Sequence, residues 1–228
     1  MKNQITLLLI LFLTSFAFSQ NSCSKYYPFD QGTTSQITTY DKKGKVAAMV
    51  DYKVESVTKA GGKEVANINS TVKDDKGEVI AESNYDVICT EDKISIDFNS
   101  LINPQLFQQF GNMEYEVTGT NIDLPNNLSV VQSLPDADMQ MKVNMGGINM
   151  NINLSMTDRK VTGKENVTTP AGTFDCFVIE YTLDIKMGMN RTSTAKQWIA
   201  EGVGMVKQED YNKKGKVTSS SLLTAFSK

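Results

Sequence analysis

The sequence predicts a mainly β protein built on an antiparallel sheet, and two patterns carry that prediction. Turn signals containing glycine recur along the chain of 228 residues, and alternating apolar and polar residues fill the stretches between them. Alternation is typical of half-buried strands, and gaps of hairpin length favour antiparallel neighbours over βαβ units. The turn signals are DKKGK (41–45), KAGGK (59–63), KDDKGE (73–78), MGGI (145–148), TTPAGT (168–173) and NKKGK (212–216).

Length and composition fit a single globular domain. Hydrophobic residues make up 40% of the chain and charged residues 21%, which is an ordinary balance for a protein with a core. The formal net charge of −3 gives no indication of a nucleic-acid partner. We therefore expect one antiparallel β domain over residues 20–228, with no nucleic acid bound, and we predict no oligomeric state.

The first 19 residues have the pattern of a secretory signal peptide. Lys2 supplies the positive start, an apolar run covers residues 5–12, and Ala17 and Ser19 are small residues at the −3 and −1 positions. We expect cleavage between Ser19 and Gln20 and a periplasmic or extracellular protein. No later stretch is long and apolar enough to predict a transmembrane segment.

Three cysteines leave two interpretations for Cys23. A lipoprotein signal would attach lipid to this residue, but it usually has Leu three positions earlier, where this chain has Gln20. An oxidising compartment favours a disulfide, and we favour Cys23 with Cys89, which would tie the N-terminus to the sheet and leave Cys176 unpaired. Three free thiols are the alternative.

One segment predicts a short helix, over residues 100–111. In NSLINPQLFQQFGNM, Asn99 or Ser100 suits the N-cap position and Gly111 suits the end. Leu106, Phe107 and Phe110 lie at helical spacing between them.

The stretch DMQMKVNMGGINMNINLSM, residues 138–156, predicts a hairpin that turns at Gly146-Gly147. This register sets each of four methionines opposite a branched aliphatic residue. The pairs are Met145 with Ile148, Met150 with Val143, Met141 with Ile152 and Met139 with Leu154. Residues directly opposite each other share a face of the sheet, so one face is entirely apolar and the other polar. The apolar face comprises Met139, Met141, Val143, Met145, Ile148, Met150, Ile152, Leu154 and Met156.

Three interpretations of the methionine face follow. Thioethers suit Cu(I), but no Met faces another in this hairpin and the chain has no histidine, so we predict no metal and no cofactor. In the second interpretation, the protein's own side chains cover this face as part of the core. Because Met is flexible and polarizable, it also suits a surface that binds varied apolar ligands. The candidate ligand-binding residues are Met139, Met141, Val143, Met145, Met150, Ile152, Leu154 and Met156, with Met187 and Met189 extending the stripe of another strand, and Trp198, the only tryptophan.

The residues for common enzymatic chemistry are missing. Without histidine the chain cannot form a Ser-His-Asp or Cys-His centre or a His-ligated zinc site. The 26 Asp and Glu residues mostly alternate with apolar residues on predicted strands, which is the pattern of a solvated face. We therefore predict that the protein is not an enzyme.

Three segments resemble a family of secreted bacterial proteins that has no established activity. They are CSKYYPFDQGTTSQITTYD (23–41), RKVTGKENVTTPAGTFDCFVIEY (159–181) and QWIAEGVGMVKQEDYNKKGKV (197–217). Members of this family look distantly similar to the periplasmic lipoprotein-carrier fold. The resemblance implies a curved antiparallel sheet, a half-barrel, with helical cover over an apolar cavity.

The functional prediction is a non-enzymatic periplasmic or secreted protein that binds an apolar ligand on the methionine face. The ligand would be a lipid, an acyl chain or a lipidated protein partner. The alternative is a structural or assembly component of the cell envelope, in which the protein's own core fills that face.

Overall fold

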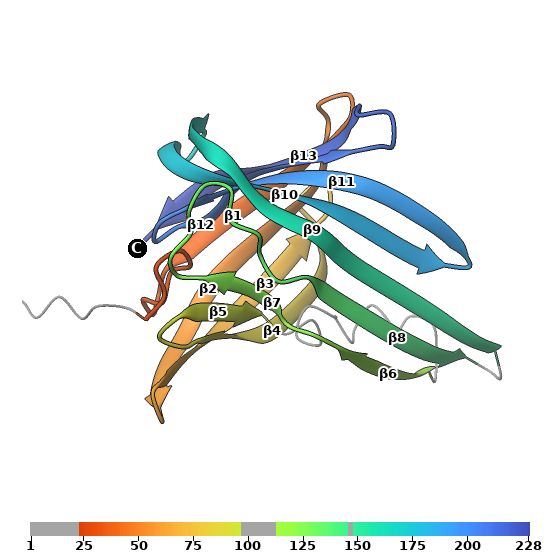
Figure 1. Ribbon diagram of the computed structural model, residues 1–228, viewed down its shortest axis with the longest axis horizontal. Helices are drawn as coiled ribbons and strands as arrows, with labels where there is room; N and C mark the ends of the chain where they lie inside the picture. The colour runs from red at the N-terminus through yellow and green to blue at the C-terminus, as the bar shows by residue number, and fades with distance from the viewer. Residues whose placement is uncertain (1–22, 97–112, 146–147) are drawn as a thin grey trace, which may run out of the picture.

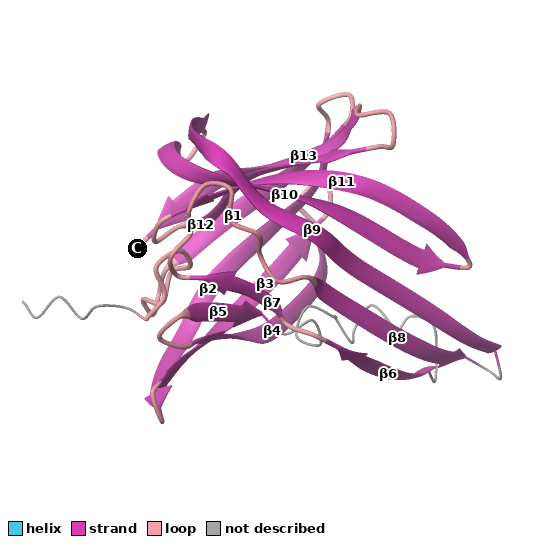
Figure 2. Cartoon of the chain, in the orientation of Figure 1, coloured by secondary structure: helices cyan, strands magenta, loops and turns pink. Residues whose placement is uncertain are grey.

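The computed structural model describes residues 23–96, 113–145 and 148–228, which form one antiparallel sheet of thirteen strands (Figure 1). Figure 2 shows strands and loops but no helix among the described residues. The strands are β1 (Thr34–Asp41), β2 (Val46–Ala60), β3 (Lys63–Lys73), β4 (Val79–Cys89), β5 (Lys93–Ile96), β6 (Met113–Gly119), β7 (Ile122–Pro125), β8 (Ala137–Met145), β9 (Ile148–Thr169), β10 (Gly172–Met187), β11 (Met189–Ala200), β12 (Gly204–Tyr211) and β13 (Val217–Ser227).

The predicted mainly β, antiparallel architecture is confirmed, whereas the half-barrel is not, because the thirteen strands form an open sheet. The helix predicted over 100–111, the signal peptide over 1–19 and the turn at Gly146-Gly147 lie outside the described residues. No helix in the described ranges is both long and apolar enough to cross a membrane.

The strand order joins the two halves of the chain through β13 and β1. The order is β6-β8-β9-β10-β11-β12-β13-β1-β2-β3-β4-β5-β7. Most neighbours in this order are also neighbours in sequence, as expected for a meander. The exceptions are the pairs β6–β8, β13–β1 and β5–β7. The two edge strands, β6 and β7, follow each other directly in the chain, with only Thr120 and Asn121 between them. One short connection therefore holds both edges of the sheet together.

Gly119 forms the corner at this connection. Its φ is 153°, and a Cβ atom there would lie 2.1 Å from the carbonyl oxygen of Asp138. The next residue, Thr120, donates its backbone N–H to that same carbonyl at 2.9 Å. Only glycine permits this close approach of two backbones.

A buried arginine strengthens the same region. Arg159 on β9 is 5% exposed, and its Nη1 donates to the carbonyl oxygens of Asp123 on β7 at 3.0 Å and of Pro135 at 2.5 Å. Beside it, Leu134 donates its backbone N–H to the carbonyl of Arg159 at 2.8 Å, and Val131 donates to that of Val161. The segment between β7 and β8 thus covers the edge of β9 beyond its pairing with β8.

Three of the predicted turns share one hydrogen-bonding scheme. In the turns at 41–45, 74–78 and 212–216, the first residue's side-chain oxygen accepts backbone N–H groups two and four residues later. Glycine follows in the fourth position with φ between 71° and 88°. An Asp or Asn side chain and a positive φ are what such turns require.

The inner face of the sheet carries the main core, to which distant strands contribute. Tyr26, fully buried, packs edge-to-face on Phe177 of β10, with ring centroids 6.0 Å apart. Because this cluster combines residues from β2–β5 with residues from β9–β11, the sheet wraps around its own core. The buried strand residues include Val54, Ile68, Val87, Ile94, Val161, Ile179 and Ile199.

The outer face has a smaller cluster around Trp198, which is 3% exposed. Val167 of β9 packs in it with Val206 of β12, although β10 and β11 separate these strands in the sheet. The end of the β9–β10 hairpin therefore curls over the outer face. Cys176 is buried in this cluster, and burial raises the pKa of its thiol to about 11, which keeps the sulfur protonated.

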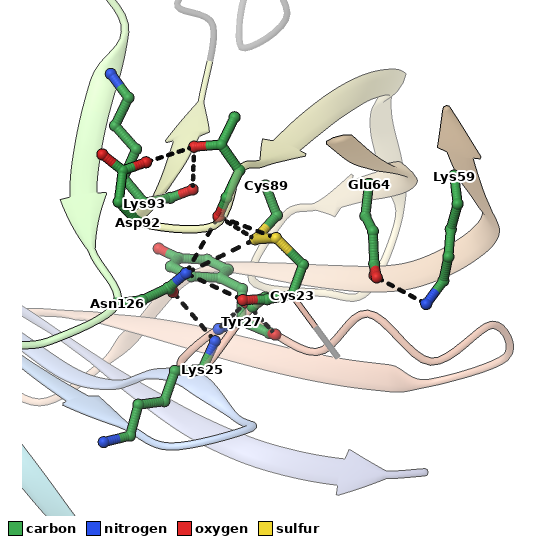
Figure 3. The surroundings of a disulfide bond; sticks show 11 residues. Cys23, Lys25, Tyr27, Lys59, Glu64, Cys89, Asp92, Lys93 and Asn126 are labelled. Carbon is green, nitrogen blue, oxygen red and sulfur yellow. Dashed lines mark hydrogen bonds and ion pairs between the residues drawn. A yellow bond between two sulfur atoms is a disulfide. The ribbon is translucent and has the colours of Figure 1, made fainter. Parts of the chain in front are cut away.

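A disulfide between Cys23 and Cys89 ties the N-terminal segment to the end of β4 (Figure 3). Next to it, the Asn126 side chain donates to the carbonyls of Cys23 at 3.0 Å and Thr90 at 3.4 Å, and accepts from the backbone of Lys25 at 3.2 Å. A sulfur held in a disulfide cannot carry a lipid thioether. The structure therefore agrees with the disulfide interpretation of Cys23 over lipidation.

We expect Gly119→Ala to lower the free energy of unfolding by about 2–4 kcal/mol, because the new Cβ would collide with the Asp138 carbonyl and strain the backbone. The matched control is Gly163→Ala on β9, where a Cβ would meet nothing within 4 Å. Urea denaturation of both variants measures the difference. Equal stability of the two variants would contradict the close approach at the corner.

Reduction of the disulfide should lower the free energy of unfolding by about 4 kcal/mol, because the bond closes a loop between residues 66 positions apart. Denaturation with and without dithiothreitol measures this change. The Cys23→Ala/Cys89→Ala variant, which has no bond to reduce, should be insensitive to the reductant. A wild-type protein that is equally insensitive would show that the bond contributes nothing.

Candidate functional site

The methionine hairpin has the register that the sequence predicts. Met139 pairs with Leu154, Met141 with Ile152, Val143 with Met150 and Met145 with Ile148. The edge strand β6 then lies on the other side of β8, with Val117 opposite Met141. The strictly alternating pattern and the predicted position of the turn were enough to predict this register.

Burial differs between the two strands of this hairpin. Met139, Met141 and Val143 on β8 are buried, whereas Ile152, Leu154 and Met156 on β9 are half-buried and Met150 is 38% exposed. Met139 packs in a small cluster with Ala137, against which Leu154 and Met156 also lie. Most of the described methionine face is therefore covered, and Met150 on β9 is its most exposed side chain.

The remaining candidates lie elsewhere. The chain turns at Gly188, with φ 75°, so Met187 ends β10 and Met189 begins β11, rather than both lying on one continuous strand. Both methionines are strongly exposed at this hairpin tip. Trp198 lies in the outer cluster, on the face opposite the main core, and donates its indole N–H to Glu165 at 2.8 Å. Met187 pairs with Ile152 of the methionine hairpin, whereas Met189 and Trp198, both on β11, have no strand pairing with it.

An apolar pocket of about 250 Å³ lies on the inner face, between the N-terminal segment and strands β1–β5 and β7. Its apolar walls come from these six strands and from Val203 and Met205 at the start of β12. They include Ile37, Val54, Ile68, Val87, Ile122 and Met205. The alternation of each strand directs these side chains inward, as in VDYKVESV, where Tyr52 and Val54 share a face.

Three tyrosines line the same pocket: Tyr27 from the N-terminal segment, Tyr52 from β2 and Tyr85 from β4. Burial raises the pKa of all three hydroxyls, that of Tyr27 to about 12. They are therefore neutral at physiological pH, when each hydroxyl can donate one hydrogen bond. Together with Thr33, Ser35 and Lys53, they give a largely apolar wall its polar groups.

One hydroxyl in the pocket wall has no protein partner. Thr33 is 2% exposed, and its Oγ1 makes no hydrogen bond in the part of the chain that the structure describes. A buried hydroxyl without a partner is unfavourable and needs an explanation, such as a ligand group that would bond to it.

The pocket is continuous with the methionine surface. Ile122 on β7 lines the pocket and also packs against the cluster that contains Met139. Met156 in turn packs against both that cluster and the main core. The apolar inner surface thus runs from the pocket to the methionine hairpin without a polar break at Ile122.

The sequence did not point to the pocket, although part of the signal was present. Tyr85 and Val87 share the alternating face that ends at Cys89, and Tyr52 and Val54 alternate in the same way. Nothing in that pattern distinguishes a pocket wall from filled core, because both require apolar side chains on one face. Which strands surround the pocket follows from the wrapping of the sheet.

Metal binding has no obvious donors in this part of the chain. Among the described residues, no three His, Cys, Asp or Glu side chains gather closely enough to hold a metal ion. The geometry that remains is an apolar pocket with neutral hydroxyls, which suits binding of an apolar or amphiphilic molecule.

Fold and pocket together define a class: an open, self-wrapping antiparallel sheet with an apolar pocket on its inner face. The chain belongs to the DUF3108-like family, whose model matches residues 30–223. The predicted membership of a family of secreted bacterial proteins is thereby confirmed. Among curated proteins, no sequence matches this chain.

Two solved structures share the fold. One is a protein of Bacteroides fragilis with a YmcC-like fold, inferred to be exported, at 21% identity and a TM-score of 0.74. The other, from Parabacteroides distasonis and inferred to be a lipoprotein, has 21% identity and a TM-score of 0.73. Each match covers 90% of this chain and 100% of the other. At this identity the likeness establishes the fold alone.

We expect the free energy of unfolding to fall as pH rises from about 10 to about 12. Unfolded tyrosines lose their proton near 10, whereas Tyr27 keeps its proton until about 12, so the folded state binds more protons in this window. Stability from this group is complete below pH 10 and lost as pH rises through 12. Denaturant titrations across this range, with tyrosinate absorbance as the probe of ionisation, measure the effect.

Tyr27→Phe is the control for this prediction, because it removes the ionisable hydroxyl and keeps the ring. The variant should lose less stability than the wild type between pH 10 and 12. Ionisation of every tyrosine near pH 10 in the folded wild type would contradict the burial of these hydroxyls.

Proposed function

We propose that the protein is an exported, non-enzymatic binder of an apolar ligand, a lipid or acyl chain, which it holds in the inner pocket. The observation that carries this proposal is the pocket itself, with its apolar walls and a volume of about 250 Å³. Small-molecule pockets usually range from about 300 to 1,000 Å³. A volume just under this range suits one acyl chain, or the part of a larger lipid that lies deepest.

The polar groups of the pocket favour an amphiphile over a pure hydrocarbon. Thr33 and the neutral hydroxyls of Tyr27, Tyr52 and Tyr85 would hydrogen-bond to a carboxylate or ester oxygen. The buried positive charge of Arg159 is close enough to Tyr27 to lower the pKa of its hydroxyl slightly against the effect of burial. The same charge would favour an anionic head group on that side.

A longer chain would extend along the methionine surface. Ile122 links the pocket to Met139, so an acyl chain that fills the pocket would continue over apolar side chains. In this proposal the open sheet acts as a carrier-like half-barrel, with the ligand taking the place of further core. The flexibility of Met suits chains of different length.

The compartment fits this function. The disulfide between Cys23 and Cys89 belongs to an oxidising environment, such as the periplasm or the outside of the cell. The structural neighbours, inferred to be an exported protein and a lipoprotein, support the same location. The absence of histidine from the sequence supports binding without covalent chemistry.

The test is fatty-acid binding by a variant with a filled pocket. Ser35 on β1 lines the pocket, so Ser35→Trp should place an indole inside it and weaken binding of a fluorescent fatty acid at least about tenfold, the loss of roughly 1.4 kcal/mol. The matched control is Thr34→Trp, which adds the same side chain on the opposite, exposed face of β1.

Native purification followed by lipid extraction and mass spectrometry gives the ligand's identity. Binding that is equal in the Ser35→Trp and Thr34→Trp variants would remove the pocket from the proposal. If the wild type neither contains lipid nor takes up fatty acid, the alternative of a structural component of the cell envelope is favoured.

A further inference from the structure

The β10–β11 hairpin tip has the features of a membrane-docking element. Its six residues, Lys186 to Arg191 (KMGMNR), are all exposed. Met187 is 60% exposed and Met189 is 74% exposed, the largest value among the exposed large hydrophobic residues of the described chain. Exposed apolar side chains grouped at a protruding end indicate a site of contact with a partner or membrane.

The tip projects beyond the end of β12. β12 pairs with β11 only as far as Thr194, so among the described strands none lies along Met189–Ser193 on that side. On the other side β9 pairs with β10 up to Ile152, opposite Met187, and then continues past the tip. Figure 1 shows the β10–β11 and β8–β9 hairpins extending in the same direction, away from the N-terminal segment. On β9, Met150 adds a third partly exposed methionine near this end.

Within the six residues of the tip, 186–191, the charges are positive only. Lys186 and Arg191 flank the two methionines, and neither forms a salt bridge within the described part of the chain. The adjoining stretch of β9, residues 148–154, contains no charged residue. The nearest acid on the hairpin is Asp184, whose carboxylate accepts the Thr192 hydroxyl.

A second hairpin provides an internal comparison. At the start of β4, Val79 is 54% exposed and Ile80 is 50% exposed, so this end also presents two apolar side chains. Its turn, however, carries Asp74, Asp75 and Glu78 against Lys73 and Lys76, and Lys73 is paired with Asp51 at 2.6 Å. The β12–β13 turn is basic, but Val217 is the one exposed large hydrophobic residue beside it. Of these three hairpin ends in the described chain, only the β10–β11 tip combines two exposed large apolar side chains with flanking charge that is positive alone.

We propose that the β10–β11 tip docks the protein on the surface of an anionic lipid bilayer, with Met187 and Met189 entering the interface and Lys186 and Arg191 contacting lipid head groups. Interfacial binding grows with the apolar area buried and with attraction between basic side chains and anionic lipids. Long basic side chains reach head groups while the residues beside them enter the apolar layer. Lys186 and Arg191 supply a local positive charge for this attraction, although the whole chain carries a net charge of −3.

The test is co-sedimentation with vesicles, using mature protein with its disulfide intact. The wild type should bind vesicles of phosphatidylglycerol and phosphatidylethanolamine, bind phosphatidylcholine vesicles much less, and dissociate as salt rises. Met187→Ser/Met189→Ser should weaken binding at least about tenfold, because it removes the apolar area that enters the interface. Lys186→Glu/Arg191→Glu should abolish the preference for anionic lipid.

Two controls separate docking from other effects. Val79→Ser/Ile80→Ser removes as many exposed apolar residues at the acidic hairpin and should bind as the wild type does. Ser35→Trp blocks the inner pocket and should also sediment normally, so failure of ligand binding and failure of docking are distinguishable.

Three results would overturn the proposal. One is unchanged sedimentation of the Met187→Ser/Met189→Ser variant, and a second is an equal loss in the Val79→Ser/Ile80→Ser variant. The third is a wild type that ignores anionic vesicles but self-associates through the tip in sedimentation velocity, which would make a second copy of the chain the occupant.

Discussion

The connection between β6 and β7 is the constraint on which the arrangement of the sheet depends. These strands are the two edges of a thirteen-stranded sheet, yet only Thr120 and Asn121 separate them in the chain. The three residue steps from Gly119 to Ile122 span only about 10 Å when fully extended, so the two edges must lie close together. The sheet is open in its hydrogen bonding but cannot lie flat. Gly119 permits the close backbone approach at this corner, and Arg159 on β9 donates a hydrogen bond to the carbonyl of Asp123 on β7.

Wrapping explains how one sheet acquires a core without a second layer. Side chains of β2–β5 meet those of β9–β11 across the interior, and the N-terminal segment inserts Tyr26 between them. The interior is not filled evenly, because Phe29 and the strands around it leave a pocket. The outer face is covered locally where the β9–β10 hairpin curls over Trp198. Packing and pocket therefore have the same origin in the curvature of the sheet.

The sequence predicted what depends on local patterns and missed what depends on wrapping. The antiparallel sheet and the Met139–Leu154 register follow from alternation and turn chemistry, both of which act over a few residues. The pocket unites Tyr27, Ile68 and Ile122, which are far apart in sequence, so no local pattern marks it. Met189 was placed on one strand with Met187 because alternation continues through Gly188, although its positive φ begins a new strand.

The methionines illustrate how one residue type serves different environments in a single fold. Met139 and Met141 are buried, whereas Met187 and Met189 extend into solvent at a projecting tip. The alternating pattern of the sequence grouped these methionines as candidates for one ligand-binding surface. The structure divides it into an interior part continuous with the pocket and an exterior part flanked by Lys186 and Arg191.

The disulfide between Cys23 and Cys89 also determines when the N-terminal segment can be fixed to the sheet. The bond fastens the segment that carries Tyr26 and Tyr27, one a core residue and the other a wall of the pocket. Thiols stay reduced in the cytosol, so the segment would be fastened only after translocation. Under the proposed function, the pocket would then be completed last, after the chain had reached its compartment and before it bound a ligand.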